Sequence, residues 1–404
     1  MTLPLRDSIG VITGVETIRW SAQPNALWVL IHTSSGVTGL GETYYQPGAV
    51  EALVHEFAID LLLGKEASRI TQHWDNLFSC VNFYGFAGAE LRMISAIDIA
   101  LWDACGKYVQ RPLYDLLGGR VRESIGIYNT CVSTPKFDDG RAFLESPAEL
   151  AVDLAAAGFR GMKIWPWDQF APQIDSAAIT GPAGWSAMGP IGHHLTLEQI
   201  DRGIDVVRKI REAVGHGIEI IIEGHSRWDL NSAVRLSRAL EPFEPLWAED
   251  LIQPTNAQDL RSLTEASRVP VAASERLMSR FAYRDLFTLR AMDIAMLDVA
   301  WTGGITEARR IADMASTYNL PVTLHDCTGP VTAFANLHLA VSLTNVNLTE
   351  VVRGFVDGYY QDVVDARLPV AGGAGCPTTL PGLGASLRPD FLERPDVTRR
   401  LSAL

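Results

Sequence analysis

The chain has 404 residues, of which 47% are hydrophobic and 20% are charged, a composition typical of a globular protein with a large buried core. The formal net charge of −13 argues against nucleic acid or an anionic membrane as the main partner. The length exceeds that of a single (β/α) barrel, which takes about 250 residues, and leaves material for a second domain.

The cysteines and the N-terminal sequence bear on the cell compartment. The five cysteines are scattered without CxxC spacing, which fits a reducing cytosol better than a disulfide framework. The first residues lack a charged region followed by a long apolar core, so no signal peptide is expected. No apolar stretch is long and charge-free enough to span a bilayer. We expect a cytoplasmic protein that acts on a small molecule, with neither nucleic acid nor membrane as a partner.

The first part of the chain alternates as strands do and then becomes helical. The runs that predict strands are 11–20, 26–35 and 37–45. Apolar residues then recur at helical spacing in 49–64 and in 89–109. Strands followed by helices indicate an α+β domain, which we place at residues 1–123.

Strand-like and helix-like segments alternate from residue 124 onward. SIGIYNTC (124–131) is the expected first strand, ESPAELAVDLAAAGF (145–159) the first helix and GMKIW (161–165) the second strand. The alternation predicts an α/β fold in which a modified TIM (β/α)7-8 barrel, residues 124–352, carries an α+β N-terminal capping domain.

Acidic residues recur at a fixed interval within the predicted barrel. Glu223, Glu249 and Glu275 stand 26 positions apart, and each follows a short apolar run. One strand-helix unit takes roughly this many residues, so each glutamate is expected at the tip of a strand. Apolar runs that end at Asp298, His325 and Glu350 continue the series. The carboxyl ends of the strands are where such a barrel keeps its chemistry.

These residue types indicate a metal site. Three converging carboxylates offer hard oxygen ligands, which suit Mg²⁺ better than Zn²⁺. The alternative is that the glutamates cap helices or pair with lysines. Asp298 and His325 end neighbouring strands, and a hydrogen bond between them would fix the tautomer of the imidazole. The pattern predicts a divalent-metal site that faces an aspartate-oriented histidine.

Two further pairs are expected at the mouth of the barrel. His225 follows Glu223 by two positions, and Trp165 stands in the same relation to Lys163. Side chains at i and i+2 of a strand share a face, so all four are expected to point into the mouth.

Two segments depart from the regular alternation of strands and helices. Sixty positions separate Lys163 from Glu223, more than double the usual interval, and the excess lies in residues 166–194, which are rich in Gly, Pro, Ala and Trp. A loop of this length at the active-site end is interpreted as a lid. Residues 353–404 are irregular and are predicted to pack back on the capping domain.

A helix signature and six shorter motifs follow one another along nearly the whole chain. They are ISAIDIALWDACGKYVQRPLYDLLGG, EGHSR, PLWAEDL, SERLMSRF, LDVAWTGGITEA, HDCTGP and LTE. In this order and at this spacing they resemble the enolase superfamily and, within it, the mandelate-racemase-like acid-sugar dehydratases. The resemblance is strongest to galactonate and gluconate dehydratases, with mannonate dehydratases further off.

The resemblance implies ligands and contacts for the substrate. Glu223, Glu249 and Glu275 would bind Mg²⁺, while Lys163 and Glu350 would contact the substrate carboxylate and the enediolate that develops from it. The positive charge is needed because a proton next to a carboxylate is very weakly acidic.

The resemblance also implies an acid and a base. His325, oriented by Asp298, would remove the proton α to the carboxylate. His225 would protonate the departing β-hydroxyl, and a histidine titrates in the useful range for that task. The expected reaction is Mg²⁺-dependent loss of water from an aldonate of the galactonate, gluconate or mannonate type, with a 2-keto-3-deoxy acid as product. Relatives usually assemble, so a homo-oligomer is expected by analogy.

Five positions depart from the family pattern. The third-strand ligand is Glu223 where the family usually has Asp, and Trp165 replaces the second lysine found in racemases, which disfavours two-base racemisation. The fourth-strand motif reads Glu249-Asp250-Leu251 in place of E-E-P, and Ser274 replaces the usual glycine.

The sequence also offers candidate residues for substrate specificity and leaves alternative functions open. Candidate substrate contacts are Trp20, Tyr84 in the stretch NFYGF (82–86), Trp165 and Arg276, with packing of domain against domain as the other explanation for the aromatic residues. The alternative reactions are epimerisation and lactone cycloisomerisation through the same enediolate. A third alternative is a metal-binding family member without turnover.

Overall fold

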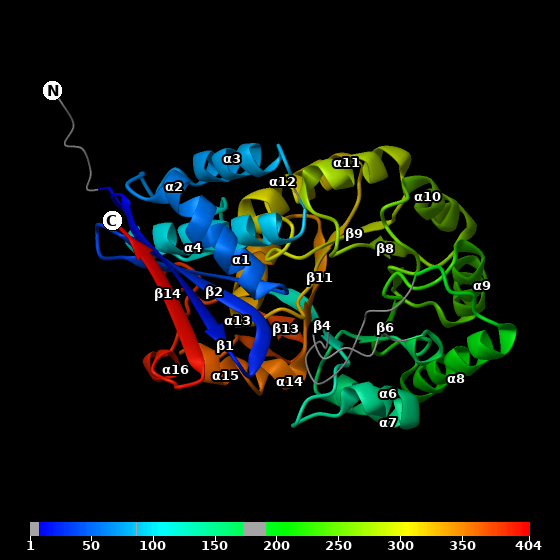
Figure 1. Ribbon diagram of the computed structural model, residues 1–404. Coiled ribbons are helices and arrows are strands. Elements are labelled where there is room, and N and C mark those ends of the chain that lie inside the picture. The colour runs from blue at the N-terminus through cyan, green and yellow to red at the C-terminus, as the bar shows by residue number, and fades with distance from the viewer. Residues whose placement is uncertain (1–7, 86, 173–190) are drawn as a thin grey trace.

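The structure is a computed structural model, and it describes residues 8–85, 87–172 and 191–404. Two parts are evident in Figure 1: a sheet flanked by helices α1 to α4, and a barrel ringed by helices α6 to α13. The predicted lid, residues 166–194, lies largely outside the described residues. Within the described ranges, no helix combines the length and the apolar character needed to cross a membrane.

The capping domain is built on an antiparallel sheet in the order β14-β1-β2-β3. Its strands are β1 (Ile12–Trp20), β2 (Gln23–Thr33), β3 (Thr38–Tyr44) and β14 (Val397–Ala403). Its helices are α1 (Pro47–Leu53), α2 (Ile59–Leu62), α3 (Ile70–Val81) and α4 (Ala89–Tyr108), with a π-helical turn (Val54–Ala58) between α1 and α2. The last strand of the chain therefore completes the first sheet. The residue boundaries of the three predicted parts stay a prediction.

The barrel contains eight parallel strands, and pairing of β11 with β4 closes the ring. The strands are β4 (Ile125–Thr130), β5 (Gly161–Ile164), β6 (Glu219–Glu223), β7 (Trp247–Glu249), β8 (Val271–Ala273), β9 (Ile294–Leu297), β10 (Val322–Leu324) and β11 (Val346–Val351). The predicted fold class, a modified TIM barrel with an α+β capping domain, is confirmed.

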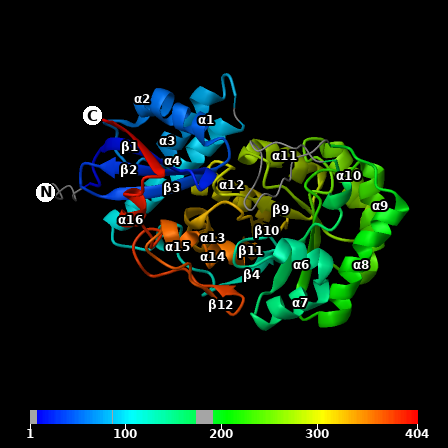
Figure 2. The same ribbon diagram turned by 60° about the horizontal axis from the view of Figure 1, so that its bottom comes forward.

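Helices surround the barrel on its outer face, as Figure 2 shows. They are α6 (Asp139–Glu145), α7 (Pro147–Ala156), α8 (Leu197–Val214), α9 (Leu230–Leu240), α10 (Ala257–Ala266), α11 (Ser279–Leu289), α12 (Gly304–Thr317) and α13 (Pro330–Ser342). Short elements complete the chain: α5 (Leu113–Leu116), α14 (Arg353–Val356), α15 (Tyr360–Val363), α16 (Pro389–Leu392), 3-10 turns (Asp168–Phe170 and Glu241–Phe243) and the hairpin β12 (Val370–Ala371) and β13 (Ala374–Gly375).

Two buried acids of the capping domain hold the barrel. Glu42 on β3 accepts the backbone N–H of Thr332 at 3.0 Å in the first turn of α13. Asp98 on α4 accepts the backbone N–H of Thr306 at 2.9 Å in the first turn of α12. Acidic groups at helix N-termini satisfy unpaired N–H groups and interact favourably with the helix dipole. Because α12 and α13 follow β9 and β10, these contacts fix the capping domain over that side of the barrel.

The sheet of the capping domain lies directly on α4. A Cβ atom added at Gly41 would lie 1.9 Å from the carbonyl oxygen of Ala96, so glycine is required by this close approach. Burial of Glu42 beside this contact raises the pKa of its carboxyl to about 7. The first turn of α1 offers a comparison, since the nearest atom to a Cβ at Gly48 is 4.0 Å away.

We predict that Gly41→Ala lowers the free energy of unfolding by about 3 kcal/mol or more, because the new methyl group can be accommodated only by moving backbone. Gly48→Ala is the matched control and should leave stability unchanged or slightly raised, since alanine favours helix. Thermal and denaturant unfolding measure both variants. Equal stability of the two variants would contradict the direct packing of β3 on α4.

Candidate active site

The predicted site residues lie at the carboxyl ends of the barrel strands. Glu223 and Glu249 are the last residues of β6 and β7, and Glu350 lies near the end of β11. Lys163 lies on β5, while Glu275, Asp298 and His325 directly follow or lie within two residues of the ends of β8, β9 and β10. Except for the partly buried Glu275, these side chains are buried, with Lys163 only 3% exposed.

Lys163 is the centre of the cluster. Its Nζ lies 2.9 Å from Oε1 of Glu249, 2.9 Å from Oε1 of Glu350 and 3.6 Å from Oε2 of Glu223. Burial opposes its charge, but the surrounding carboxylates outweigh burial and raise the pKa of Lys163 well above its usual range. The sequence indicated such pairing only as an alternative to metal binding, and the structure shows that Lys163 contacts two of the predicted ligands.

One ammonium group does not neutralise all the acids. Burial tends to raise the pKa of Glu350, but the charges of Lys163 and His325 lower it to about 2. Glu223 differs: burial, followed by the charge of Glu249, raises its pKa well above the usual range. Oε2 of Glu275 is buried without a hydrogen-bond partner. The cluster therefore has more carboxylate oxygens than its own cation satisfies.

This excess fits a hard divalent cation. The residues that would hold Mg²⁺ are Glu223, Glu249 and Glu275, because Mg²⁺ prefers oxygen ligands and keeps sites open for substrate. Among the described residues, a different group of possible metal ligands, His325, Cys327 and Glu350, has ligand atoms within 4.8 Å of one another. Burial raises the pKa of the Cys327 thiol to about 12, and Mg²⁺ prefers oxygen ligands to a neutral thiol, so that group suits Mg²⁺ poorly.

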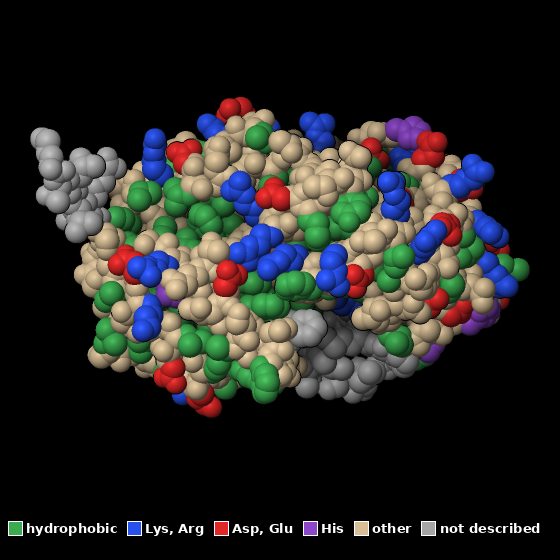
Figure 3. All heavy atoms as spheres, turned by 90° about the horizontal axis from the view of Figure 1, so that it is seen from above, with side chains coloured by type: hydrophobic (Ala, Val, Ile, Leu, Met, Phe, Trp, Pro, Cys, Tyr) green, Lys and Arg blue, Asp and Glu red, His purple; other side chains and the backbone are tan. Residues whose placement is uncertain are grey.

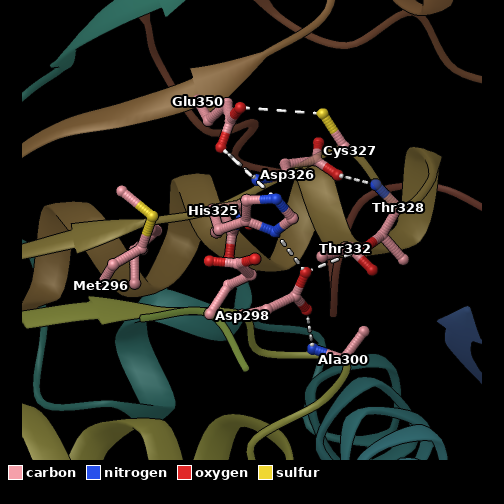
Figure 4. A network of polar contacts seen from close by, with 12 residues as sticks. Met296, Asp298, Ala300, His325, Asp326, Cys327, Thr328, Thr332 and Glu350 are labelled. Atoms are coloured by element: carbon pink, nitrogen blue, oxygen red, sulfur yellow. Dashed lines mark hydrogen bonds and ion pairs between the residues drawn. The ribbon is translucent and has the colours of Figure 1, made fainter. Parts of the chain in front are cut away.

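Asp298 holds His325 through a short hydrogen bond, which Figure 4 shows. Nδ1 of His325 lies 2.7 Å from Oδ2 of Asp298, as the sequence predicts. Asp298 is itself fixed by the backbone N–H of Ala300 at 2.7 Å and by the hydroxyl of Thr328 at 2.9 Å. Burial lowers the pKa of His325, but the charge of Glu350 and the bond to Asp298 outweigh it and raise the pKa well above its usual range. The imidazole is thus oriented with Nε2 toward Glu350, 3.8 Å away.

His225 is held in a way that strand alternation does not predict. β6 ends at Glu223, and His225 adopts a left-handed backbone with φ +48°, so the argument from i and i+2 on one strand does not apply. Its backbone N–H donates to Oε1 of Glu223 at 2.6 Å. Its Nδ1 lies 2.6 Å from Oδ2 of Asp168, which is also buried. His225 therefore belongs to a second histidine–aspartate pair.

Asp168 is the functional candidate that sequence reasoning missed. It follows β5 in the 3-10 turn Asp168–Phe170, at the start of the segment that interrupts the barrel rhythm. Its Oδ2 also lies 3.6 Å from Nε of the buried Arg227. The sequence signal available was an acidic residue five positions after Lys163, within the loop expected at the active-site end.

The predicted substrate contacts separate into two groups. Trp165 lies near the site, since its ring is 5.6 Å from that of His225 and 5.1 Å from that of Phe143. Arg276 is partly exposed and pairs with Asp250 at 3.4 Å. Both positions are compatible with substrate binding, which stays a prediction.

Trp20 and Tyr84 lie elsewhere. Trp20 is buried against the C-terminal segment, where its Nε1–H donates to Asp396 at 2.8 Å and its ring packs on Phe391. This is the domain packing that the sequence left open, and no contact with the rim accompanies it in the described residues. Tyr84 is 61% exposed and packs edge-on against Phe57, so a role for it in substrate binding rests on the sequence alone.

Comparison with known families agrees with the fold. Residues 147–391 match the family described as enolase C-terminal domain-like, and residues 15–118 match the N-terminal domain of the mandelate racemase and muconate lactonizing enzyme family. The first match alone covers more than half of the chain. The protein belongs to the enolase superfamily, in its mandelate racemase-like branch.

Individual relatives span nearly the whole chain. A protein named D-galactonate dehydratase from Ralstonia nicotianae is 31% identical over 383 residues, 93% of this chain and 92% of the relative. A D-xylonate dehydratase from Haloferax volcanii is 28% identical over 385 residues, 95% of this chain and 88% of the relative. A solved enolase of the mandelate racemase subgroup from Agrobacterium tumefaciens is 37% identical, with a TM-score of 0.86, and the match covers 97% of this chain and 99% of that chain.

We predict that Mg²⁺ raises the thermal stability of the protein, because a ligand that binds only the folded state stabilises it by about 2.7 kcal/mol at a hundred times its Kd. Glu223→Gln should abolish most of this rise. Without Mg²⁺ this variant should be at least as stable as the parent, since the substitution removes one of the crowded buried carboxylates.

Glu219→Gln is the matched control, because Glu219 begins the same strand at the opposite end of the barrel. Unfolding curves at increasing Mg²⁺ concentration, with chelator-treated protein as the reference, test the assignment. An undiminished response to Mg²⁺ in Glu223→Gln would rule Glu223 out as a ligand.

Proposed function

We propose that the protein is a Mg²⁺-dependent dehydratase that removes water from a sugar acid, of which an aldonate is the first expectation, to give a 2-keto-3-deoxy acid. The observation that carries the proposal is the buried Asp298–His325 pair, whose Nε2 lies 3.8 Å from Glu350, an ion-pair partner of Lys163. The names of the D-galactonate and D-xylonate dehydratases that the chain resembles support the same reaction class.

The first step is removal of the proton α to the substrate carboxylate. Asp298 holds Nδ1 of His325, so Nε2 of the neutral imidazole is the atom that takes the proton, and the neighbouring carboxylates stabilise the imidazolium that forms. Lys163, the buried cation of the rim, would bind the substrate carboxylate in exchange for part of its contact with Glu249 and Glu350. Bound Mg²⁺ supplies additional positive charge that stabilises the developing enediolate.

The second step is loss of the β-hydroxyl. With Nδ1 of His225 on Asp168, Nε2 is the ring nitrogen that exchanges a proton with the substrate, and it donates that proton to the leaving hydroxyl as water departs. The resulting enol then takes up a proton at C3, loses the proton of its C2 hydroxyl group and becomes the keto acid. Because β6 and β10 are four strands apart in an eight-strand ring, acid and base approach from opposite sides, which favours anti elimination.

The placement of the two histidines on opposite sides of the barrel also favours epimerisation, which is the second candidate function. Two imidazoles, each held by a carboxylate, are the arrangement that two-base inversion needs, although the second-strand lysine of racemases is absent. The two reactions are distinguished by mass, because elimination yields a product lighter by one water whereas epimerisation conserves the mass of the substrate. Binding of a small-molecule acid, a cytoplasmic location and a homo-oligomeric state are part of the same proposal.

We predict that His325→Asn abolishes exchange of the α-proton in D₂O and lowers turnover by about 10²- to 10⁴-fold, the usual contribution of a general base. His225→Asn should still exchange the α-proton but form little keto acid. Proton NMR of the substrate in D₂O and an assay for keto acid measure both quantities. His216→Asn, at an exposed histidine, is the control. Persistent exchange in His325→Asn would remove His325 as the base.

We also predict a selective defect in Asp168→Asn, since this change removes the charge that orients His225 while conserving the shape of the side chain. Keto-acid formation should fall by about 10²-fold while α-proton exchange stays near that of the parent. The double variant with His225→Asn should be no worse than His225→Asn alone, because residues that act as a unit are not additive.

Asp229→Asn is the matched control for Asp168→Asn. Asp229 also pairs with a histidine, at 3.2 Å from Nδ1 of His194, but on a more exposed surface, and asparagine can still cap α9 at that position. Additive losses in the double variant, or equal loss of exchange and elimination in Asp168→Asn, would mean that Asp168 supports the structure in general and not His225 in particular.

A further inference from the structure

Two buried hydrogen-bond donors near the proposed base have no partner among the described residues. One is Nη1 of Arg92, on α4 of the capping domain. Nε1 of Trp301, which follows β9 by four positions and whose side chain is 6% exposed, is likewise unsatisfied. A buried donor without an acceptor costs free energy, and native proteins leave few of them, so each calls for a ligand or a water.

The two donors lie next to each other and next to the base. The guanidinium carbon of Arg92 lies 4.4 Å from the centre of the Trp301 ring and 5.8 Å from that of Tyr45. The Trp301 ring lies in turn 5.2 Å from the ring of His325. The stack places a cation of the capping domain at the wall of the site, on the side of β9 and β10.

Arg92 has no acidic partner among the described residues, which distinguishes it from the stacked Arg280. Within the described residues no carboxylate forms an ion pair with Arg92, whereas Arg280, stacked on Phe281 at 4.6 Å, pairs with Glu307 at 2.6 Å. Burial lowers the pKa of Arg92 to about 10, against the smaller opposing effects of Asp298, Tyr45 and Glu275. The charges of Asp298 and Glu275 act on Arg92 because Arg92 faces the mouth of the barrel, where both carboxylates lie.

Arg92 and Lys163 lie on opposite sides of the site. Lys163 lies on β5, and Trp301 follows β9, four strands away in the ring of eight. The site therefore has one cation on each of two opposite sides. A protein with a net charge of −13 repels anions in general, so these local cations are what would admit a ligand with two negative ends.

We propose that Arg92 and Trp301 form a subsite for a second carboxylate, so that the preferred substrate is a sugar diacid, an aldarate, which spans from Lys163 to Arg92. A planar guanidinium binds a carboxylate through two parallel hydrogen bonds, and the indole N–H supplies a further donor. This inference rests on the proposed function and narrows its substrate class from sugar acids in general to those with a carboxylate at both ends.

The test compares an aldarate with the aldonate of the same configuration, using the Mg²⁺-loaded protein. The parent should have the higher kcat/KM for the aldarate. Arg92→Met, which keeps the length and the packing on Trp301 but removes the charge, should lose that preference by about 10²-fold, mainly through KM for the aldarate. Trp301→Phe keeps the ring, removes the donor and should reduce the preference about tenfold.

Arg280→Met is the matched control, because it removes a stacked arginine of the same kind that already has an acidic partner, and it should leave the preference unchanged. An aldonate preferred by the parent, or an equal loss for both substrates in Arg92→Met, would overturn the subsite. Retention of the preference in Trp301→Phe would remove the indole from it.

Binding measured by calorimetry separates this inference from the proposed function. If the parent binds an aldarate more tightly than the aldonate and Arg92→Met does not, the subsite stands even where neither acid is turned over. If the parent converts an aldonate to keto acid but shows no dependence on Arg92, dehydration stands and the subsite fails.

Discussion

The ion pairs of Lys163 are the constraint on which the rest of the site depends. Three carboxylates that come from separate strands, Glu223, Glu249 and Glu350, lie within 3.6 Å of one buried ammonium group. Removing a single partner of a buried ion pair is costly, because it leaves an uncompensated charge. The cluster therefore holds the ends of β5, β6, β7 and β11 in one arrangement. It also leaves an excess of negative charge that only a further cation can balance.

The capping domain supports the strands that carry His325 and Asp298, and it contributes a cation to the site. Glu42 and Asp98 fix it to the first turns of α13 and α12, directly behind the strands that carry His325 and Asp298. The same domain brings Arg92 to the rim. On the face seen in Figure 3, basic and acidic side chains are interspersed. At the barrel mouth, by contrast, buried carboxylates gather around Lys163. A mouth closed from water strengthens each electrostatic contact within it, which is what removal of a weakly acidic proton requires.

The sequence predicted those features that depend on periodicity. A repeat of 26 residues places Glu223, Glu249 and Glu275 at successive strand tips, and a continuous barrel makes Asp298 and His325 neighbours. Periodicity does not predict residues whose role depends on contacts between segments that are distant in the sequence. Asp168 meets His225 only because a turn after β5 lies against a turn after β6, and His225 leaves the strand through a left-handed backbone. The packing of Trp20 could not be predicted for the same reason, since its partner Asp396 lies 376 positions away.

The two histidine–aspartate pairs show how one barrel can separate acid from base work. Asp298 lies one strand from His325 within the ring, a neighbour relation that the barrel provides without any added segment. Asp168 lies in the turn that follows β5, at the start of the long β5–β6 connection, so the second pair depends on a loop and not on neighbouring strands. The proposed base is thus positioned by the barrel, whereas the proposed acid is oriented by this connection. Variation in this connection is therefore the simplest route by which related barrels would keep proton abstraction and alter the fate of the enediolate.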